Sequence, residues 1–245
     1  MHFLKGIIGA PRLKEGDVLV WTAELDSVTE TRLAQLARFL SRDENQRASR
    51  FRFERDRKRF IVCRGVLREI LGTYLQRDPE RIDFNYGPQG KPYLEGSETA
   101  GSLYFNVSHS SGCAIYALSL GEIGVDLEFV KPIPEMQALV DQYFSVAERI
   151  GFGSVPPDLK LKAFYNCWTR KEAYVKALGG GLLIALDQFD VSVDPNSPAR
   201  LVRVQETSGD DLPWSLHSFD PSTEAVAALV CPKNNEPCFC GQWPT

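Results

Sequence analysis

The sequence predicts an α+β protein built from two similar halves. The chain has 245 residues, of which 43% are hydrophobic, and this is enough for one large core or two smaller ones. Helical periodicity precedes strand-like runs up to residue 120, and the same order returns after it. The join near residue 121 predicts an N-terminal half at 1–121 and a C-terminal half at 122–245, although no residue-level repeat is visible.

Helices come first in the N-terminal half. Apolar residues at helical spacing after Val28 predict one helix, and Ser41-Arg-Asp-Glu44 is a capping box that begins a second. A longer third helix is expected to begin with Asp56 as its N-cap. Strands are then predicted at 82–86, 103–108 and 113–120, with the loop GPQGKP at 87–92. A tight hairpin at 120–123 is expected to lead directly into a strand at 123–128.

The second half repeats the order. Two prolines at 131–134 break the chain, and Ser145-Val-Ala-Glu148 is another capping box. A long helix is predicted at 158–178, ended by the glycines at 179–181. Strands are predicted at 189–193, 201–204, 215–219 and 225–230. Each half should therefore pack helices on a small antiparallel sheet.

The charge of the chain restricts its partners. A formal net charge of -4 argues against a protein that binds nucleic acid by general electrostatics. The segment 38–68 is nevertheless rich in arginine, which suits a small polyanionic ligand. No run approaches the roughly 18 apolar residues of a membrane span, and the start of the chain lacks the pattern of a signal peptide. We therefore expect a cytoplasmic protein that binds neither nucleic acid nor membrane.

Two carboxylates stand out in the strand at 123–128. Asp126 and Glu128 are two residues apart, so on a strand they point to the same face, with Cα atoms about 6.5–7 Å apart. Such a pair can hold one divalent cation, and oxygen ligands favour Mg²⁺ or Mn²⁺ over zinc. Taken alone, the commoner explanation of such a pair is a solvent-exposed face.

A second cluster lies in WTRKEAYVKALGGG at 168–181. Trp168, Glu172 and Lys176 form one stripe of a helix, because they are four residues apart. An ordinary surface ion pair has the same spacing as Glu172 and Lys176. The tryptophan on the stripe favours a cleft instead, since large aromatic side chains are usually buried.

A third cluster is YFNVSHS at 104–110, an apolar run that ends in small polar residues and one of only three histidines. These residues suit hydrogen bonding to an anion, although a lone histidine is more often structural. Ser108 and His109 are sequence neighbours, which argues against a nucleophile and base of a hydrolase.

Together the segments FNVSHS (105–110), GVDLE (124–128) and WTRKEAYVKALGGGL (168–182) resemble the 4'-phosphopantetheinyl transferases, in particular their larger, surfactin-synthetase-activating type. The resemblance extends over GKP at 90–92 and the arginine-rich helix, and covers most of residues 40–195. It implies a pseudo-twofold monomer with its active site in the cleft between the halves. It also implies Mg²⁺-dependent transfer of the phosphopantetheine arm of coenzyme A to a serine of an apo acyl or peptidyl carrier protein, releasing adenosine 3',5'-bisphosphate.

The resemblance also implies roles for particular residues. Asp126, Glu128 and Glu172 match the metal-site acids, and Glu172 matches the general base. The implied coenzyme A contacts are Lys176, Ser108, His109, Arg47, Arg59 and Lys91. The chain departs from the family pattern at Glu44, where many members have a basic residue, and at the glycines 179–181, where relatives often have a lysine.

Two other functions remain open at this point: a coenzyme A or nucleotide-binding module without turnover, and a Mg²⁺-dependent phosphohydrolase. Retention of three acids and a lysine argues against the first, because a binding module has no need of a base. We expect acidic carrier proteins to dock on a cationic or apolar surface near Phe144 and Phe152, or on the arginine-rich segment at Arg50 and Arg52. The sequence does not indicate which carriers or pathway are served.

Overall fold

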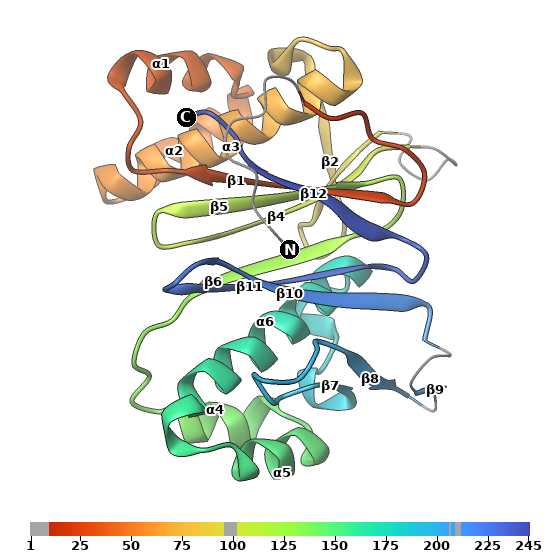
Figure 1. Cartoon of the computed structure of the whole chain (residues 1–245). Coiled ribbons are helices and arrows are strands. Elements are labelled where there is room, and N and C mark those ends of the chain that lie inside the picture. Colours follow the sequence, from red (N-terminus) through yellow and green to blue (C-terminus); the bar gives the residue numbers. More distant parts are fainter. Residues whose placement is uncertain (1–9, 96–101, 206, 209–211) are drawn as a thin grey trace.

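The computed structural model describes residues 10–95, 102–205, 207–208 and 212–245. The elements are stacked in layers, with helices, a sheet, a second sheet and further helices in succession (Figure 1). Apolar clusters fill the space between each sheet and its helices and also the space between the two sheets. The protein is therefore α+β, as the sequence predicts. Within the described ranges, no helix is long and apolar enough to cross a membrane.

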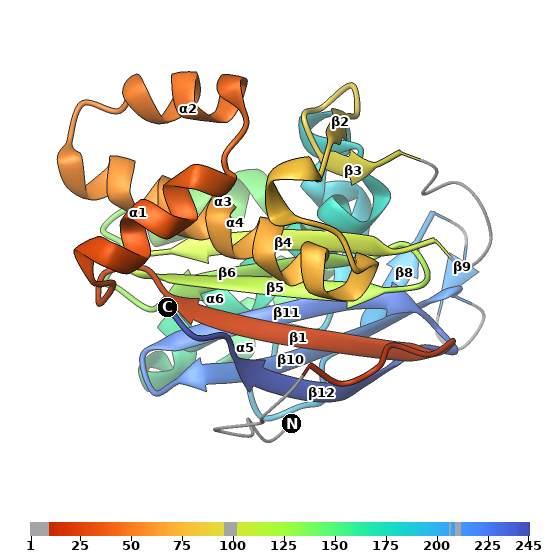
Figure 2. The same ribbon diagram turned by 90° about the horizontal axis from the view of Figure 1, so that it is seen from above.

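The first half begins with a strand and not with a helix. Its helices α1, α2 and α3 lie above its sheet (Figure 2). In chain order its elements are β1 (Asp17–Glu24), α1 (Glu30–Phe39), α2 (Arg42–Ser49), α3 (Glu54–Leu75), β2 (Phe84–Tyr86), β3 (Pro92–Leu94), β4 (Tyr104–Ser110) and β5 (Cys113–Ser119).

The second half begins with a strand in the same way. Its helix α4, which the sequence analysis missed, is followed by the predicted α5 and α6. The elements are β6 (Gly124–Phe129), α4 (Met136–Tyr143), α5 (Val146–Ser154), α6 (Lys160–Leu178), β7 (Phe189–Val191), β8 (Leu201–Val204), β9 (Thr207–Ser208), β10 (Trp214–Ser222), β11 (Ala225–Pro232) and β12 (Glu236–Gln242).

The two halves have the same topology. The first sheet contains the order β1-β5-β4 and the second the order β6-β11-β10. Each order combines the first strand of its half with two later consecutive strands, which in the second half are the last two before β12. In each half a long helix, α3 or α6, packs on the sheet. Two small sheets, β2-β3 and β7-β8-β9, complete the molecule.

A buried ion pair also recurs in both halves. The capping-box residue of α2, Glu44, pairs with Arg68 of α3 at 2.7 Å, and Arg68 donates to the carbonyls of Pro79 and Ile82. In the second half the capping-box residue of α5, Glu148, pairs with Lys171 of α6 at 2.8 Å. Lys171 donates to the carbonyls of Leu186 and Phe189. The likeness of the halves thus extends to side chains, which the sequence alone did not reveal.

The departure at Glu44 now has a structural explanation. Glu44 is buried, and a second arginine, Arg64, lies 3.0 Å from its other oxygen. Its carboxylate therefore neutralises two arginines of α3 and caps α2. An acid at this position serves the packing of the arginine-rich helix, since buried cations need a paired charge.

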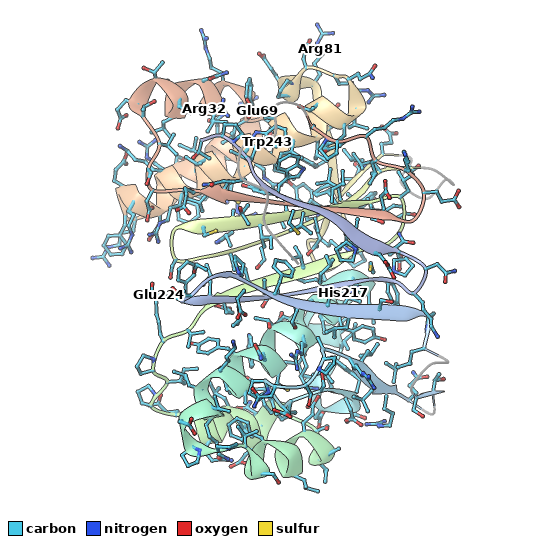
Figure 3. The ribbon with its side chains drawn as sticks, in the orientation of Figure 1. Arg32, Glu69, Arg81, His217, Glu224 and Trp243 are labelled. Carbon is cyan, nitrogen blue, oxygen red and sulfur yellow. The ribbon has the colours of Figure 1, made fainter. Side chains whose placement is uncertain are left out.

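The C-terminal strand lies in the sheet of the first half, although the predicted boundary at residue 121 assigns it to the second half. β12 pairs with β1 in parallel, which places 236–242 in the sheet of the first half and makes that sheet mixed and not purely antiparallel. Trp243 then enters the first core and packs edge-on against Trp21, with ring centroids 4.9 Å apart. Its indole donates to Glu69 at 2.6 Å, and Glu69 also binds Arg32; Figure 3 shows these three side chains together.

Two local predictions were wrong. Phe53 and not Asp56 is the N-cap of α3, and it makes no side-chain capping hydrogen bond. The predicted hairpin at 120–123 is absent from the described ladders, because β5 pairs with β1 and β4 whereas β6 pairs with β11 of the other sheet. The connection from β5 to β6 therefore crosses from one sheet to the next.

Candidate active site

The two halves meet along strands β4 and β6. Asn106, Ser108 and Ser110 alternate along β4, so their side chains share one face. These side chains accept hydrogen bonds from successive backbone N–H groups on the edge of β6, those of Val125, Leu127 and Phe129. The polar residues of FNVSHS thus join the sheets, which explains their alternation.

The start of β6 lies directly against α6. A Cβ atom at Gly124 would overlap the carbonyl oxygen of Ala173 and the backbone nitrogen of Ala177. A glycine at this position lets the strand and the helix approach backbone to backbone. The carboxylates of β6 consequently lie beside the stripe of α6 that carries Glu172 and Lys176.

Asp126 is at the centre of the resulting cluster. It is buried, and its Oδ1 accepts hydrogen bonds from the Lys176 ammonium at 2.6 Å and from the Ser108 hydroxyl at 2.9 Å. Lys176 also donates to Ser108 at 3.0 Å. The predicted residues Asp126, Ser108 and Lys176 therefore form one network across the seam between the halves.

Glu128 and Glu172 complete the acidic group. Burial raises the pKa of Glu128 above its ordinary value, and the negative charge of Asp126 adds to this effect. Burial also raises the pKa of Glu172, again with a contribution from Asp126. Ser110 donates to Glu128 at 3.0 Å and opposes its shift. The negative charges of the three carboxylates act on one another, and such a group favours the binding of a proton or a cation.

The donor set suits a divalent cation. Asp126 Oδ2 is buried without a hydrogen-bond partner, so it is an acceptor still available to a cation. Carboxylate oxygens are the ligands that Mg²⁺ takes. In the part of the chain that the structure describes, no three His, Cys, Asp or Glu side chains converge closely enough to enclose an ion, and the Lys176 ammonium lies next to Asp126 instead.

An arginine pocket of about 570 Å³ opens on the first-half side of the cluster. Arg47, Arg59 and Arg64 line it together with Phe60, Tyr86 and other residues, among them His109 and Ser110 of β4. Arg47 lies over the ring of Phe60 at 5.4 Å. This wall of guanidinium groups and rings suits an aromatic, phosphorylated ligand.

Arg59 and His109 are oriented within the arginine pocket. Arg59 forms a bidentate pair with Asp26 at 2.7 and 2.5 Å, a partner that the sequence did not predict. Loss of hydration, together with the positive charges of Lys176, Arg47 and Arg59, lowers the pKa of His109. At neutral pH the ring is therefore largely uncharged.

An apolar pocket of about 640 Å³ lies on the second-half side. Glu172 and Lys176 line it, with Tyr143, Val175 and Ile184 among its apolar walls. Gly90, Pro92 and Val107 line both this pocket and the arginine pocket, so the two adjoin across β4 and the loop at 87–92. The acid cluster thus lies between a cationic and an apolar site.

Lys91 is placed differently from the other predicted contacts. Its ammonium donates to the carbonyls of Ile123, Lys176 and Ala177 at 3.1, 2.6 and 3.1 Å. An ammonium has three N–H donors, and each has an acceptor here. In this structure the Lys91 ammonium therefore contacts backbone, and Lys91 lines the apolar pocket and not the arginine pocket.

Phe144 and Phe152 do not themselves form the docking surface expected near them. Phe144 and Phe152 are both 1% exposed and belong to the second core, so they present no surface to a partner. Phe144 stacks on Phe164, and Phe152 packs edge-on against Phe144. Arg50 and Arg52 are exposed, and Arg52 lies over the exposed ring of Phe53 at 5.4 Å.

The site places partly buried carboxylates beside an ammonium group and next to an arginine pocket. Enzymes that stabilise negative charge on a phosphate-bearing substrate use groups of these kinds. Profiles of two protein families match the chain: the 4'-phosphopantetheinyl transferase superfamily over 122–231, and the 4'-phosphopantetheinyl transferase N-terminal family over 27–120. The chain belongs to the 4'-phosphopantetheinyl transferase superfamily and is an enzyme of that kind.

Individual relatives show how far the similarity extends. The 4'-phosphopantetheinyl transferase HetI of Nostoc sp. is 37% identical over 219 residues, which cover 89% of each chain. The transferase Sfp of Bacillus subtilis is 30% identical over 62% of this chain and 66% of its own. A solved holo-[acyl-carrier-protein] synthase of Thermotoga maritima matches 44% of this chain and 61% of its own, with 22% identity and a TM-score of 0.33.

Proposed function

We propose that this enzyme transfers the 4'-phosphopantetheine arm of coenzyme A to a serine of an apo acyl or peptidyl carrier protein and releases adenosine 3',5'-bisphosphate. The observation that carries the proposal is the acid cluster of Asp126, Glu128 and Glu172, with Lys176, between an arginine pocket and an apolar pocket. Membership of the superfamily supports it.

The proposal includes a bound Mg²⁺, for which Mn²⁺ is a possible substitute. Asp126, Glu128 and Glu172 would hold it, and the unpartnered Oδ2 of Asp126 supports this assignment. When bound, the cation supplies a Lewis acid that stabilises negative charge on the pyrophosphate. Burial is the larger cause of the raised pKa values of Glu128 and Glu172, and the charge of Asp126, the smaller cause, is what a bound cation would offset.

Glu172 is proposed as the general base. A carboxylate with a raised pKa is a better proton acceptor at neutral pH than an ordinary one. It would accept the proton of the carrier serine, whose oxygen bonds to the phosphorus that bears the pantetheine. The bond from that phosphorus to the bridging oxygen breaks, and the oxygen leaves with adenosine 3',5'-bisphosphate. Lys176 would balance the charge that develops on the leaving phosphate.

The nucleotide end of coenzyme A is proposed to lie in the arginine pocket. Arg47 and Arg59 would bind its phosphates, and His109, whose pKa is lowered by loss of hydration and by its cationic neighbours, would donate or accept one hydrogen bond. Ser108 contributes through Asp126 and Lys176, the two groups to which it is bonded. The apolar pocket is left for the pantetheine end.

Carrier docking is proposed at Arg50 and Arg52, which are exposed beside the arginine pocket. Reversal of both charges should raise the KM for an acidic carrier and leave the affinity for coenzyme A unchanged, because rim charges steer association. Titration of carrier and of coenzyme A separately measures the two effects. We further propose that the enzyme acts as a cytoplasmic monomer with one active site in the cleft between 1–121 and 122–245.

One experiment tests the function directly. The protein is mixed with coenzyme A, Mg²⁺ and an apo-acyl carrier protein, and the carrier is weighed by mass spectrometry. We expect the carrier to gain the mass of one phosphopantetheine arm, in step with the release of adenosine 3',5'-bisphosphate. Chelation of the metal should stop the reaction.

The same assay separates the alternatives. A binding module would retain coenzyme A and leave the carrier unchanged. A phosphohydrolase would cleave coenzyme A in the absence of any carrier. Either result would overturn the proposal, and testing acyl and peptidyl carriers in parallel defines which kind is preferred.

A further inference from the structure

The loop at 87–92 connects the first half of the protein to the second through one side chain. Lys91 comes from this loop, just before β3, and it extends to the second half. Its three acceptors are the carbonyls of Ile123, which immediately precedes β6, and of Lys176 and Ala177 in the last turn of α6. One ammonium therefore holds three segments that are distant in sequence.

Two of these acceptors, the carbonyls of Lys176 and Ala177, lie at the end of a helix. The last carbonyls of a helix have no intrahelical partner, and a cation near them also interacts favourably with the helix dipole. α6 ends at Gly179, whose N–H reaches the Lys176 carbonyl at 3.3 Å. Lys91 approaches the same carbonyl at 2.6 Å and makes the shorter bond. Loss of hydration lowers the pKa of Lys91 to about 8, in keeping with an ammonium enclosed among carbonyls.

The segments that Lys91 joins are those that carry the acid cluster. Glu172 and Lys176 lie on the last two turns of α6, and Asp126 lies two residues inside β6. Lys176 must reach across to Asp126 to make its 2.6 Å contact. The angle at which α6 ends therefore decides the position of Lys176, and a shift of that turn would separate it from Asp126.

We propose that Lys91 is a positioning residue, which fixes the last turn of α6 against the start of β6 and so holds Lys176 and Glu172 in register with Asp126. The inference rests on the proposed function for its kinetic consequences but not for its structural ones. It assigns to Lys91 a role other than a phosphate contact, because all three donors are used by backbone carbonyls.

Lys91→Met tests the inference, since methionine has a similar length and flexibility but no donor. The matched control is Lys162→Met, a surface lysine at the start of α6 whose ion pair with Asp220 is solvent-exposed. Three quantities are measured for both variants: the Kd for coenzyme A by calorimetry, kcat and KM for carrier modification, and amide hydrogen exchange of residues 172–183. The exchange experiment needs no activity.

We expect Lys91→Met to exchange faster at the end of α6, and its kcat to fall about tenfold or more, because small displacements of reacting groups are costly. The Kd for coenzyme A should stay within about twofold of that of the wild type, since an interaction made only in the transition state affects kcat alone. Lys162→Met should behave like the wild type. Lys91→Arg, which keeps donors for carbonyls, should retain the exchange protection and part of the kcat.

Other outcomes overturn the inference. A Kd for coenzyme A that rises as much as kcat/KM falls, with unchanged exchange, would make Lys91 a ligand contact. Unchanged exchange and unchanged kcat would leave it without a role in positioning. If Lys91→Met does not fold, Lys91→Arg decides: full exchange at the end of α6 in a folded Lys91→Arg contradicts the proposal. A wild-type enzyme that fails to modify any carrier removes the proposed function, while the exchange result still stands.

Discussion

Asp126 makes contacts that no strand residue on a solvent-exposed face would make. It is buried, bonded through one oxygen to Lys176 and Ser108, and unpartnered at the other. Burying an oxygen without a hydrogen-bond partner costs about 1–3 kcal/mol of stability. This cost indicates that Asp126 Oδ2 has a functional role. The electrostatics of the site thus depend on a few side chains within one seam.

Glu172→Gln is expected to remove most transfer activity and to preserve the fold. The amide cannot accept the serine proton, and loss of a general base typically lowers kcat by about 10²–10⁴-fold. Side-chain shape is retained, so the Kd for coenzyme A should change little. Turnover and calorimetry are compared with those of Glu224→Gln, an exposed glutamate outside the cluster. Wild-type turnover in Glu172→Gln would show that another group accepts the proton.

Lys91 predicts a particular dependence of stability on pH. Its pKa is lowered from 10.5 to about 8 in the folded protein by loss of hydration. Between these values the unfolded chain binds one proton more than the folded one, so the contribution of Lys91 to stability rises with pH and is complete above 10.5. Below pH 8 both states are protonated and the cost of burying the charge is constant.

The measurement is the free energy of unfolding by urea at pH 7.5 and 9.5, for the wild type and for Lys91→Met. Taking the difference between the two proteins removes the titration of all other groups. We expect wild-type stability to increase relative to the variant on going to the higher pH. A constant difference would mean that Lys91 titrates with an ordinary pKa.

At the scale of helices and strands, features set by residues close together in the sequence were predicted, and features set by residues far apart in the sequence were missed. The capping boxes at Ser41 and Ser145 and the end of α6 at Gly179 are set by residues within four positions of each other, and all three were predicted. β1 and β12 were missed, because each is stabilised by a partner more than 200 residues away. The hairpin at 120–123 was wrong for the same reason, since the pairing of β6 with β11 competes with it.

The same distinction holds at the site. Strand and helix periodicity placed Asp126 on one face with Glu128, and Glu172 on one stripe with Lys176. Their selection as site residues, together with Ser108, came from the resemblance to the transferase family and not from the spacing alone. The pairing of Arg59 with Asp26 could not be found in this way, since the two lie 33 residues apart on different elements. The three carbonyls that bind Lys91 are backbone groups and leave no mark in the sequence.

Gly124 allows the close packing of β6 against α6. In Gly124→Ala the new Cβ meets backbone atoms of Ala173 and Ala177, which cannot rotate away as a side chain can. We expect a loss of at least about 1–3 kcal/mol of stability, the usual cost of overpacking, with a fall in activity as α6 moves away. The control is Gly153→Ala in α5, where the added methyl group meets nothing within 4 Å. Urea unfolding of both variants gives the comparison, and equal stability would contradict the contact.

At the scale of the whole molecule, the two halves share an order of elements but meet differently at their two seams. At one seam, side chains of β4 bind the edge of β6, and the acid cluster lies beside this junction. The corresponding strand of the first half is β1, and there the backbone of β12 takes the edge. β12 therefore covers the edge of β1, which is equivalent to the edge of β6 beside the acid cluster. Among the described residues, the acid cluster is thus found at the β6 edge and has no counterpart at the β1 edge.

The packing of the C-terminal segment on the first half is expected to stabilise the fold and to take no part in catalysis. Trp243 fills the first core against Trp21, and its indole donates to Glu69 (Figure 3). None of these three residues lines the arginine pocket or the apolar pocket. Trp243→Ala should cost about 3–5 kcal/mol, as for other large aromatic side chains removed from a core. Trp243→Phe keeps most of the packing and removes the donor, so it should cost about 1–3 kcal/mol.

Urea unfolding measures these losses, and Gln242→Ala, at an exposed neighbouring position, is the control. The Kd for coenzyme A should be the same in all of the folded variants, because the arginine pocket contains no residue of the C-terminal segment. A loss of coenzyme A affinity in folded Trp243→Phe would mean that the C-terminal closure also sets the geometry of the site. Equal stability of Trp243→Ala and the wild type would mean that Trp243 does not contribute to the stability of the first core.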